Sequence, residues 1–163
     1  MNTSKLSALT FALGVGWAGT PAMADTATET AKALVAPFYD AFNPAPGKDV
    51  GALLRSVTAE DWVSCSGNDT CAPRDAVIAG ITGFGQAIPN LTWAIKETIL
   101  AGDKIIVRGE ANGTPPGEFI GAPHNGKSFT IMSIDIHTVR DGKIVQTYHV
   151  EDMLGAQGQL MKK

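Results

Sequence analysis

The chain lacks any run of lysine and arginine, and this limits the partners it is expected to bind. Its 163 residues carry 13 basic and 16 acidic side chains, for a formal net charge of −3. Its aromatic residues are not interleaved with basic ones. Because a basic patch or stripe is the usual footprint of nucleic-acid binding, nucleic acid is not an expected partner.

Motifs for metal binding and for nucleophilic catalysis are missing as well. The three histidines, His124, His137 and His149, do not form a recognised zinc-binding spacing, so no metal site is predicted. Ser64 and Ser66 lack the sequence context of a nucleophile elbow, so nothing indicates a serine hydrolase.

The sequence also lacks an apolar run long enough to span a membrane. The stretch at residues 6–17 is shorter than the roughly 20 residues that a spanning helix needs. It follows Lys5 and precedes Ala22-Met23-Ala24, a small-x-small cleavage pattern, so residues 1–24 are predicted to be a secretory signal peptide. A retained N-terminal anchor is the alternative. After cleavage, residues 25–163 form the mature protein, which is expected to be periplasmic or secreted and free of the membrane.

Only two cysteines occur in the chain, Cys65 and Cys71, and both lie in the mature part. In an oxidising compartment, an isolated nearby pair is predicted to form a disulfide. A redox-active pair would need the C-x-x-C spacing and a metal site would need a second pair of ligands, and neither is present. Because the loop between the cysteines is short, the disulfide is expected to add only about 2 kcal/mol to the free energy of unfolding.

The chain does have enough apolar residues for a single folded core. It is 44% hydrophobic and 18% charged, which is typical of one globular domain. A run of helices followed by a run of antiparallel strands indicates an α+β fold. The curved sheet is expected to wrap around the helices as a cone with a pocket inside it. Apolar spacing predicts helices near residues 26–42, 49–54, 73–87 and 151–160, and strands near residues 59–65, 91–100, 104–111, 127–139 and 144–152.

Asp141-Gly142 between the last two strands is a strong hairpin signal. With Gly142 in the left-handed position of a bulged type I turn, Val139 pairs with Lys143, and Asp135 pairs with Thr147. A two-residue type I′ turn would shift the pairing by one residue and separate Asp135 from His149. The bulged register predicts a polar face with Ser133, Asp135, His137, Thr147, His149 and Glu151, and an apolar face with Ile134, Ile136, Ile144, Tyr148 and Val150.

Asp135 and His149 on the polar face form the candidate acid/base pair. A carboxylate beside an imidazole orients the ring and raises its basicity, which suits proton transfer near neutral pH. The alternative is a structural hydrogen bond inside a lined cavity. His137 lies nearer the hairpin tip and is expected to be solvated or to support the pair.

Several segments resemble the SnoaL-like polyketide cyclase family, within the NTF2-like superfamily. The most specific feature is the Gly-x-Phe-x-Gly loop at residues 117–121, followed by the Asp-Gly-Lys hairpin at residues 141–143. The resemblance runs over the whole mature chain. It also includes the helix at residues 33–43, Asp-Trp-Val at 61–63, Ile-Pro-Asn-Leu-Thr-Trp at 88–93, residues 101–109, 113–114 and 126–129, Ile-Asp-Ile-His at 134–137, and the closing helix.

The resemblance implies a cone-shaped α+β barrel that dimerises through its sheet and works without metal or organic cofactor. In this family an acid/base pair removes a proton next to a carbonyl, and an aldol closure follows. Related sequences carry His-Trp-Asp on the last strand where this chain has Thr147-Tyr148-His149, so the usual aspartate is His149 here. The expected catalytic residues are His149 and Asp135, and the expected ligand contacts are His137, Tyr39, Trp62, Phe119 and Thr147.

The sequence therefore predicts an exported, homodimeric domain with acid/base chemistry on a small apolar carbonyl compound. The chemistry would be of the cyclase, isomerase or lyase type. Two rival functions remain open at this point: a non-catalytic domain that binds a small ligand in the same pocket, and a dimeric interaction module with a filled cone.

Overall fold

The computed structural model describes the backbone of residues 21–162 and the side chains of residues 26–162. Most of the predicted signal peptide, residues 1–20, lies outside the described residues. In order the elements are α1 (Pro21–Asp40), α2 (Val50–Val57), β1 (Thr58–Cys65), β2 (Cys71–Pro73), α3 (Arg74–Ala87), β3 (Thr92–Ala101), β4 (Lys104–Gly113), β5 (Phe129–Arg140), β6 (Lys143–Glu151) and α4 (Met153–Met161).

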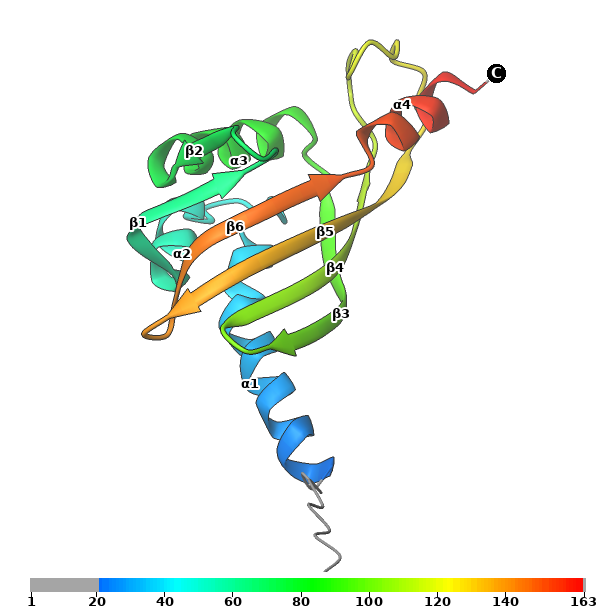
Figure 1. The fold of residues 1–163 in the computed structure, drawn as a ribbon. Helices are drawn as coiled ribbons and strands as arrows, with labels where there is room; N and C mark the ends of the chain where they lie inside the picture. The colour runs from blue at the N-terminus through cyan, green and yellow to red at the C-terminus, as the bar shows by residue number, and fades with distance from the viewer. Residues whose placement is uncertain (1–20, 163) are drawn as a thin grey trace, which may run out of the picture.

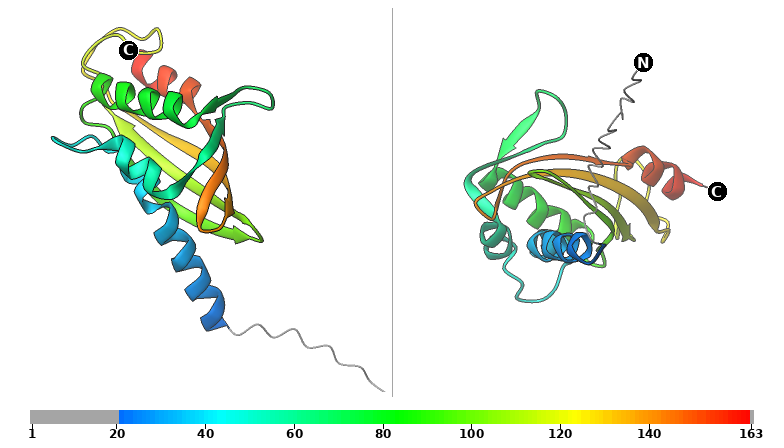
Figure 2. Two further views of the ribbon diagram at one scale, coloured as in Figure 1. Left: turned by 90° about the vertical axis from the view of Figure 1, so that its left-hand side faces the viewer. Right: turned by 60° about the horizontal axis from the view of Figure 1, so that its bottom comes forward.

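One six-stranded sheet organises the fold, with the strand order β2-β1-β6-β5-β4-β3. The strands β3 to β6 form an antiparallel meander, and β1 pairs in parallel with β6. Figures 1 and 2 show α1, α2 and α3 gathered on the concave side of this sheet, with α4 beyond one end. The predicted α+β architecture is confirmed, although the sheet is curved and open rather than a closed barrel. Among residues 21–162, no helix is long and apolar enough to cross a bilayer.

The core lies between α1 and the concave face of the sheet. The predicted apolar stripe of α1 is the face that packs inward, and Val35, Phe38 and Tyr39 are almost fully buried. They meet Trp62 of β1 and Val107 of β4, which are inaccessible to solvent. Because burying one large apolar side chain stabilises a fold by about 1.5–3 kcal/mol, this packing fixes the position of α1 against the sheet.

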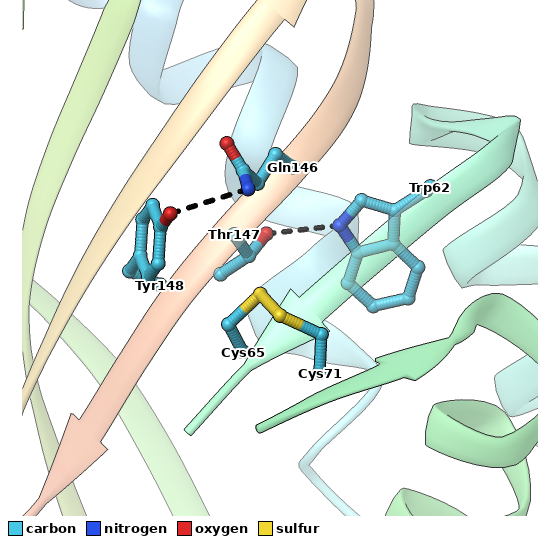
Figure 3. The surroundings of a disulfide bond; sticks show 6 residues. All are labelled: Trp62, Cys65, Cys71, Gln146, Thr147 and Tyr148. Carbon is cyan, nitrogen blue, oxygen red and sulfur yellow. Dashed lines mark hydrogen bonds between the residues drawn. A yellow bond between two sulfur atoms is a disulfide. The ribbon is translucent and has the colours of Figure 1, made fainter. Parts of the chain in front are cut away.

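Cys65 and Cys71 form the predicted disulfide. They lie directly opposite each other in the ladder between β1 and the short strand β2, which the sequence did not predict. Figure 3 shows the bond beside Trp62 and Thr147. Since α3 begins immediately after β2, the disulfide holds the start of α3 close to the sheet.

The register of the final hairpin differs from the predicted one. Arg140 pairs with Lys143, and both Asp141 and Gly142 have positive φ, which defines a two-residue type I′ turn. The predicted pairs of Val139 with Lys143 and of Asp135 with Thr147 are therefore wrong.

A bulge in β6 restores the polar face of the hairpin. Val139 pairs with Ile144 and Thr138 with Gln146, so Val145 is the extra residue on β6. Beyond the bulge, Asp135 pairs directly with His149. The I′ turn alone would have separated these two side chains, and the bulge cancels its one-residue shift.

The outer face of the sheet carries the predicted apolar side chains with one correction. Tyr148 and Val150 are exposed, and Ile134 and Ile136 are half-buried. In Figures 1 and 2 no described helix covers this face of the sheet. Ile144 was predicted on this face but is fully buried in the core. The bulge causes this difference, because it reverses the side-chain alternation between Ile144 and Thr147.

We expect the mature protein to form a symmetric homodimer through this outer face, because exposed apolar patches on a sheet usually mark an interface. Light scattering at micromolar concentration should give the mass of two chains. Val150→Lys should give a monomer, because Val150 lies on this face and is 59% exposed. Leu154→Lys is the matched control on α4, at 78% exposure, and should remain dimeric. A monomeric wild type, or identical behaviour of the two variants, contradicts this expectation.

Candidate functional site

A cavity of about 280 Å³ lies between α1, α3 and the neighbouring ends of β1 and β6. Its wall is mostly apolar, and its titratable side chains are His149 and Glu151. Small-ligand sites typically combine an apolar wall with a few polar groups in this way. The lining residues are Phe38, Phe42, Ser64, Val77, Gly80, Ile81, Phe84, Trp93, His149, Glu151 and Met153.

His149 lies between two carboxylates. Its Nδ1 is 2.6 Å from Oδ1 of Asp135 on β5, and its Nε2 is 3.4 Å from Oε2 of Glu151. Glu151 is two residues further along β6, so period-two alternation places it on the same face as His149. The side chains of His149 and Glu151 are 22% and 21% exposed, whereas that of Asp135 is only 1% exposed. Glu151 and His149 therefore reach the cavity, and Asp135 lies behind them.

The second carboxylate oxygen of Asp135 also accepts a hydrogen bond. The hydroxyl of Tyr39 on α1 lies 2.9 Å from Oδ2 of Asp135 and 3.0 Å from Nε2 of His137. All three side chains are almost fully buried. A helix residue thus joins two inward-facing residues of β5 in one polar cluster.

The cluster ends in a hydrogen bond from β1. Nδ1 of His137 lies 3.0 Å from Oγ1 of Thr147, and Nε1 of Trp62 donates to the same oxygen at 3.0 Å. Figure 3 shows the indole of Trp62 directed at the hydroxyl of Thr147. The buried polar atoms of Trp62, Thr147 and His137 therefore all have partners, as buried polar groups require.

One arrangement of protons gives every donor in this chain an acceptor. The indole of Trp62 can only donate, so the hydroxyl of Thr147 accepts there. In this arrangement the hydroxyl of Thr147 donates its own proton to Nδ1 of His137. A neutral His137 then carries its proton on Nε2 and donates to Tyr39. Tyr39 in turn donates to the ionised carboxylate of Asp135. In this arrangement Asp135 is charged, His137 is neutral and every donor has an acceptor.

The pKa directions of the two histidines are opposite. Burial lowers the pKa of His137 to about 4, and the charge of His149 adds to this effect against the attraction of Asp135. Burial also acts to lower the pKa of His149, but hydrogen bonds and charge attraction from Asp135 and Glu151 outweigh it and raise this pKa to about 10. Burial, with the charge and hydrogen bond of Asp135, raises the pKa of Tyr39 far above its usual value. At neutral pH the cluster holds a neutral His137, a neutral Tyr39 and a protonated His149.

Trp93 of β3 forms the wall next to His149, with 6.0 Å between the two ring centroids. Its Nε1 donates to Oγ of Ser133 at 3.2 Å. Gly109 of β4 makes this contact sterically feasible, because a Cβ there would lie 2.5 Å from that oxygen and 2.8 Å from the indole nitrogen. The position of Trp93 is therefore set both by the packing of its ring and by the hydrogen bond of its indole nitrogen.

The structure brings together the predicted pair, Asp135 and His149, across directly opposed positions of β5 and β6. His137 is fully buried, so it is not solvated, and it supports the pair through Tyr39. Their roles in catalysis remain predictions.

The five residues expected to contact a ligand do not line the cavity. Tyr39, His137, Thr147 and Trp62 belong to the buried hydrogen-bonded chain behind it. Phe119 lies in the loop between β4 and β5, with its ring 5.8 Å from that of Phe84 and 5.9 Å from that of Phe129 between centroids. Ligand contact by these residues stays an untested prediction that the cavity wall does not favour.

Sequence reasoning did not single out Glu151 as a site residue, although it placed Glu151 on the polar face. The available signal was its position two residues after His149, which predicts a shared strand face. The aromatic wall formed by Phe38, Phe42 and Phe84 was also missed, because apolar helix spacing indicates core and cavity alike. Among the described residues, no group of three or more histidine, cysteine, aspartate or glutamate side chains is placed to hold a metal ion.

A curved sheet with helices on its concave side and a cavity between them defines the NTF2-like class of α+β folds. Solved structures with this fold include IdmH of Streptomyces antibioticus, a candidate polyketide cyclase, at 27% identity and a TM-score of 0.69 over 80% of this chain and 97% of that one. A candidate SnoaL-like polyketide cyclase from Jannaschia sp. CCS1 is 17% identical, with a TM-score of 0.70 over 83% and 94%. AclR of Streptomyces galilaeus, a candidate hydroxylase, is 23% identical, with a TM-score of 0.69 over 83% and 87%.

The chain belongs to the SnoaL-like polyketide cyclase family, whose sequence profile matches residues 33–160. No curated protein sequence matches it significantly. Family membership supports chemistry of the cyclase or isomerase type. Of the three solved structures above, two are described as candidate cyclases and one as a candidate hydroxylase.

Proposed function

We propose that this protein is an exported enzyme that catalyses acid/base chemistry on a small apolar carbonyl compound, without a cofactor. The observation that carries the proposal is the pairing of His149 and Glu151 at one end of an apolar cavity, with Asp135 buried behind His149. Perturbed titratable groups that converge in a cleft are typical of catalytic sites. Family membership supports the same class of chemistry.

Glu151 is the proposed general base. Its carboxylate takes a proton from the carbon next to the substrate carbonyl, and the electron pair of that C–H bond forms the carbon–carbon double bond of an enolate. Asp135 cannot fill this role, because it does not line the cavity and both of its oxygens already accept hydrogen bonds. His149 is also disfavoured as the base, because its pKa of about 10 keeps the ring protonated at neutral pH.

His149 is the proposed electrophile. With Nδ1 bound to Asp135, its Nε2–H faces the cavity side and donates to the substrate carbonyl oxygen in place of Glu151. This donor stabilises the negative charge that develops on that oxygen as the proton leaves the carbon. Asp135 holds the ring in position and keeps it charged, so no reorganisation is needed during the reaction.

The enolate can then react in two ways that conserve all atoms. In an isomerisation, Glu151 returns the proton to a different carbon of the same molecule. In a cyclisation, the enolate carbon attacks a second carbonyl of the same molecule, and the resulting alkoxide takes the proton from Glu151. Neither route requires an oxidant, a reductant or a metal.

Proton abstraction can be tested before the natural substrate is known. The purified mature protein in D₂O should accelerate deuterium exchange at the α-carbons of 2-tetralone, a neutral bicyclic ketone, above the protein-free rate measured by NMR. Glu151→Gln and His149→Ala should each lower the protein-dependent rate by about 100- to 10,000-fold. Glu60→Gln on β1, an exposed carboxylate that does not line the cavity, is the matched control and should exchange like the wild type.

The outcome separates the enzyme from its rival. If 2-tetralone binds but the wild type does not exceed the protein-free rate, the non-catalytic ligand-binding function is favoured. If Glu151→Gln retains the wild-type rate, Glu151 is not the base.

Export is proposed from the cleavage pattern at residues 22–24 and is compatible with the Cys65–Cys71 disulfide. N-terminal sequencing of protein recovered from the periplasm or medium should begin at Asp25. Recovery of the chain from the cytosol alone, with Met1 intact, would exclude this route.

A further inference from the structure

We propose that the cavity selects flat, neutral aromatic carbonyl compounds and rejects the corresponding carboxylates, and that Glu151 determines this selectivity. The inference deepens the proposed function and rests on it only in taking the same cavity as the binding site. It concerns binding and does not depend on turnover.

The charged side chains around the cavity add up to a net negative charge. Protonated His149 contributes one positive charge, while Asp135 on β5 and Glu151 on β6 contribute two negative charges. Asp135 lies 2.6 Å from the ring of His149 and already balances it. The other titratable groups in the cluster are neutral at neutral pH, because burial lowers the pKa of His137 on β5 and raises that of Tyr39 on α1. The charge of Glu151 is therefore the one left over for an incoming ligand to meet.

Among the side chains of residues 26–162, no other charged group lines the cavity, so none of them offsets this net negative charge for an anionic ligand. A carboxylate bound against Nε2 of His149 would lie beside the carboxylate of Glu151, within an apolar wall where screening by water is weak. Like charges placed together in this way disfavour the wrong ligand strongly. A neutral carbonyl oxygen accepts the same hydrogen bond from His149 without this repulsion.

The shape of the wall favours flat rings. Phe38, Phe42, Phe84 and Trp93 all line the cavity, and the rings of Phe42 and Trp93 lie 4.5 Å apart between centroids. Aromatic side chains prefer offset-stacked or edge-to-face contacts with other rings. The volume of about 280 Å³ lies just below the range of roughly 300–1,000 Å³ that is typical for drug-sized ligands. One or two fused rings therefore suit this cavity better than a long flexible chain.

A matched pair of probes isolates the charge. 2-Acetylnaphthalene and 2-naphthoate share the same two rings and a carbonyl group. The ketone carries a methyl group at the position where the carboxylate has its second oxygen and its negative charge. Equilibrium dialysis of the mature protein at neutral pH should give a Kd for 2-acetylnaphthalene at least about tenfold lower than that for 2-naphthoate.

Glu151→Gln removes the charge and keeps the size of the side chain. We expect it to tighten 2-naphthoate binding by about tenfold and to change the Kd for 2-acetylnaphthalene by less than about threefold. Glu60→Gln, which removes the same charge from an exposed site on β1, should leave both constants unchanged. Glu151→Ala provides a second variant, and circular dichroism establishes that each variant is folded.

Three results would overturn the inference. The first is a wild type that binds 2-naphthoate as tightly as 2-acetylnaphthalene. The second is a Glu151→Gln variant that shifts both constants equally. The third is an absence of binding of either probe at millimolar concentration. Selective binding without deuterium exchange would uphold the inference and reject the enzyme, whereas exchange without selectivity would do the reverse.

Discussion

The hydrogen-bonded ion pair between Asp135 and His149 is the interaction on which the rest of the site depends. A carboxylate that is 1% exposed is costly to bury unless it is paired and its oxygens are hydrogen-bonded. Here one oxygen accepts from His149 and the other from Tyr39. The pair keeps His149 charged. The proposed acid role of His149 rests on that charge, and so does the proposed role of Glu151 as the group that accepts a proton from a ligand. Both proposed roles thus depend on one buried charge behind the cavity wall.

Three segments of the fold, β6, α1 and β1, supply the hydrogen bonds that stabilise the charge of Asp135 directly or through other residues. The bulge in β6 sets Asp135 opposite His149, α1 supplies Tyr39 from the concave side, and β1 reaches His137 indirectly through Trp62 and Thr147. In the proton arrangement described above, each hydrogen bond of this chain donates toward Asp135, starting from Trp62 on β1. Removing a member would leave a buried polar group without a partner, which costs more than an exposed hydrogen bond contributes. The parallel pairing of β1 with β6, at the edge of the meander, therefore also matters for the site.

Much of this could be predicted from sequence because period-two and helical spacing are local signals. They gave the meander, the inward face of α1 and the shared face of Asp135 and His149. The disulfide was predicted instead from the isolated pair of cysteines in a chain expected to be exported. The turn type and the bulge were not predictable in the same way, since Asp-Gly fits both a bulged type I turn and a type I′ turn. The buried position of Ile144 and the roles of Tyr39 and Trp62 depend on contacts between distant segments, which no local pattern records. The five expected ligand contacts lie away from the cavity wall for the same reason, and ligand contact by them stays a prediction.

The protonation states of His149 and His137 test the account most directly, and ¹⁵N NMR of the imidazole rings measures both. At neutral pH, His149 should carry protons on both nitrogens, and His137 should carry one, on Nε2. As the pH rises, His149 should lose its proton only near pH 10, and as the pH falls, His137 should stay neutral until about pH 4. A His149 that titrates near the ordinary histidine pKa of about 6.5, or a His137 protonated on Nδ1 at neutral pH, would contradict the account.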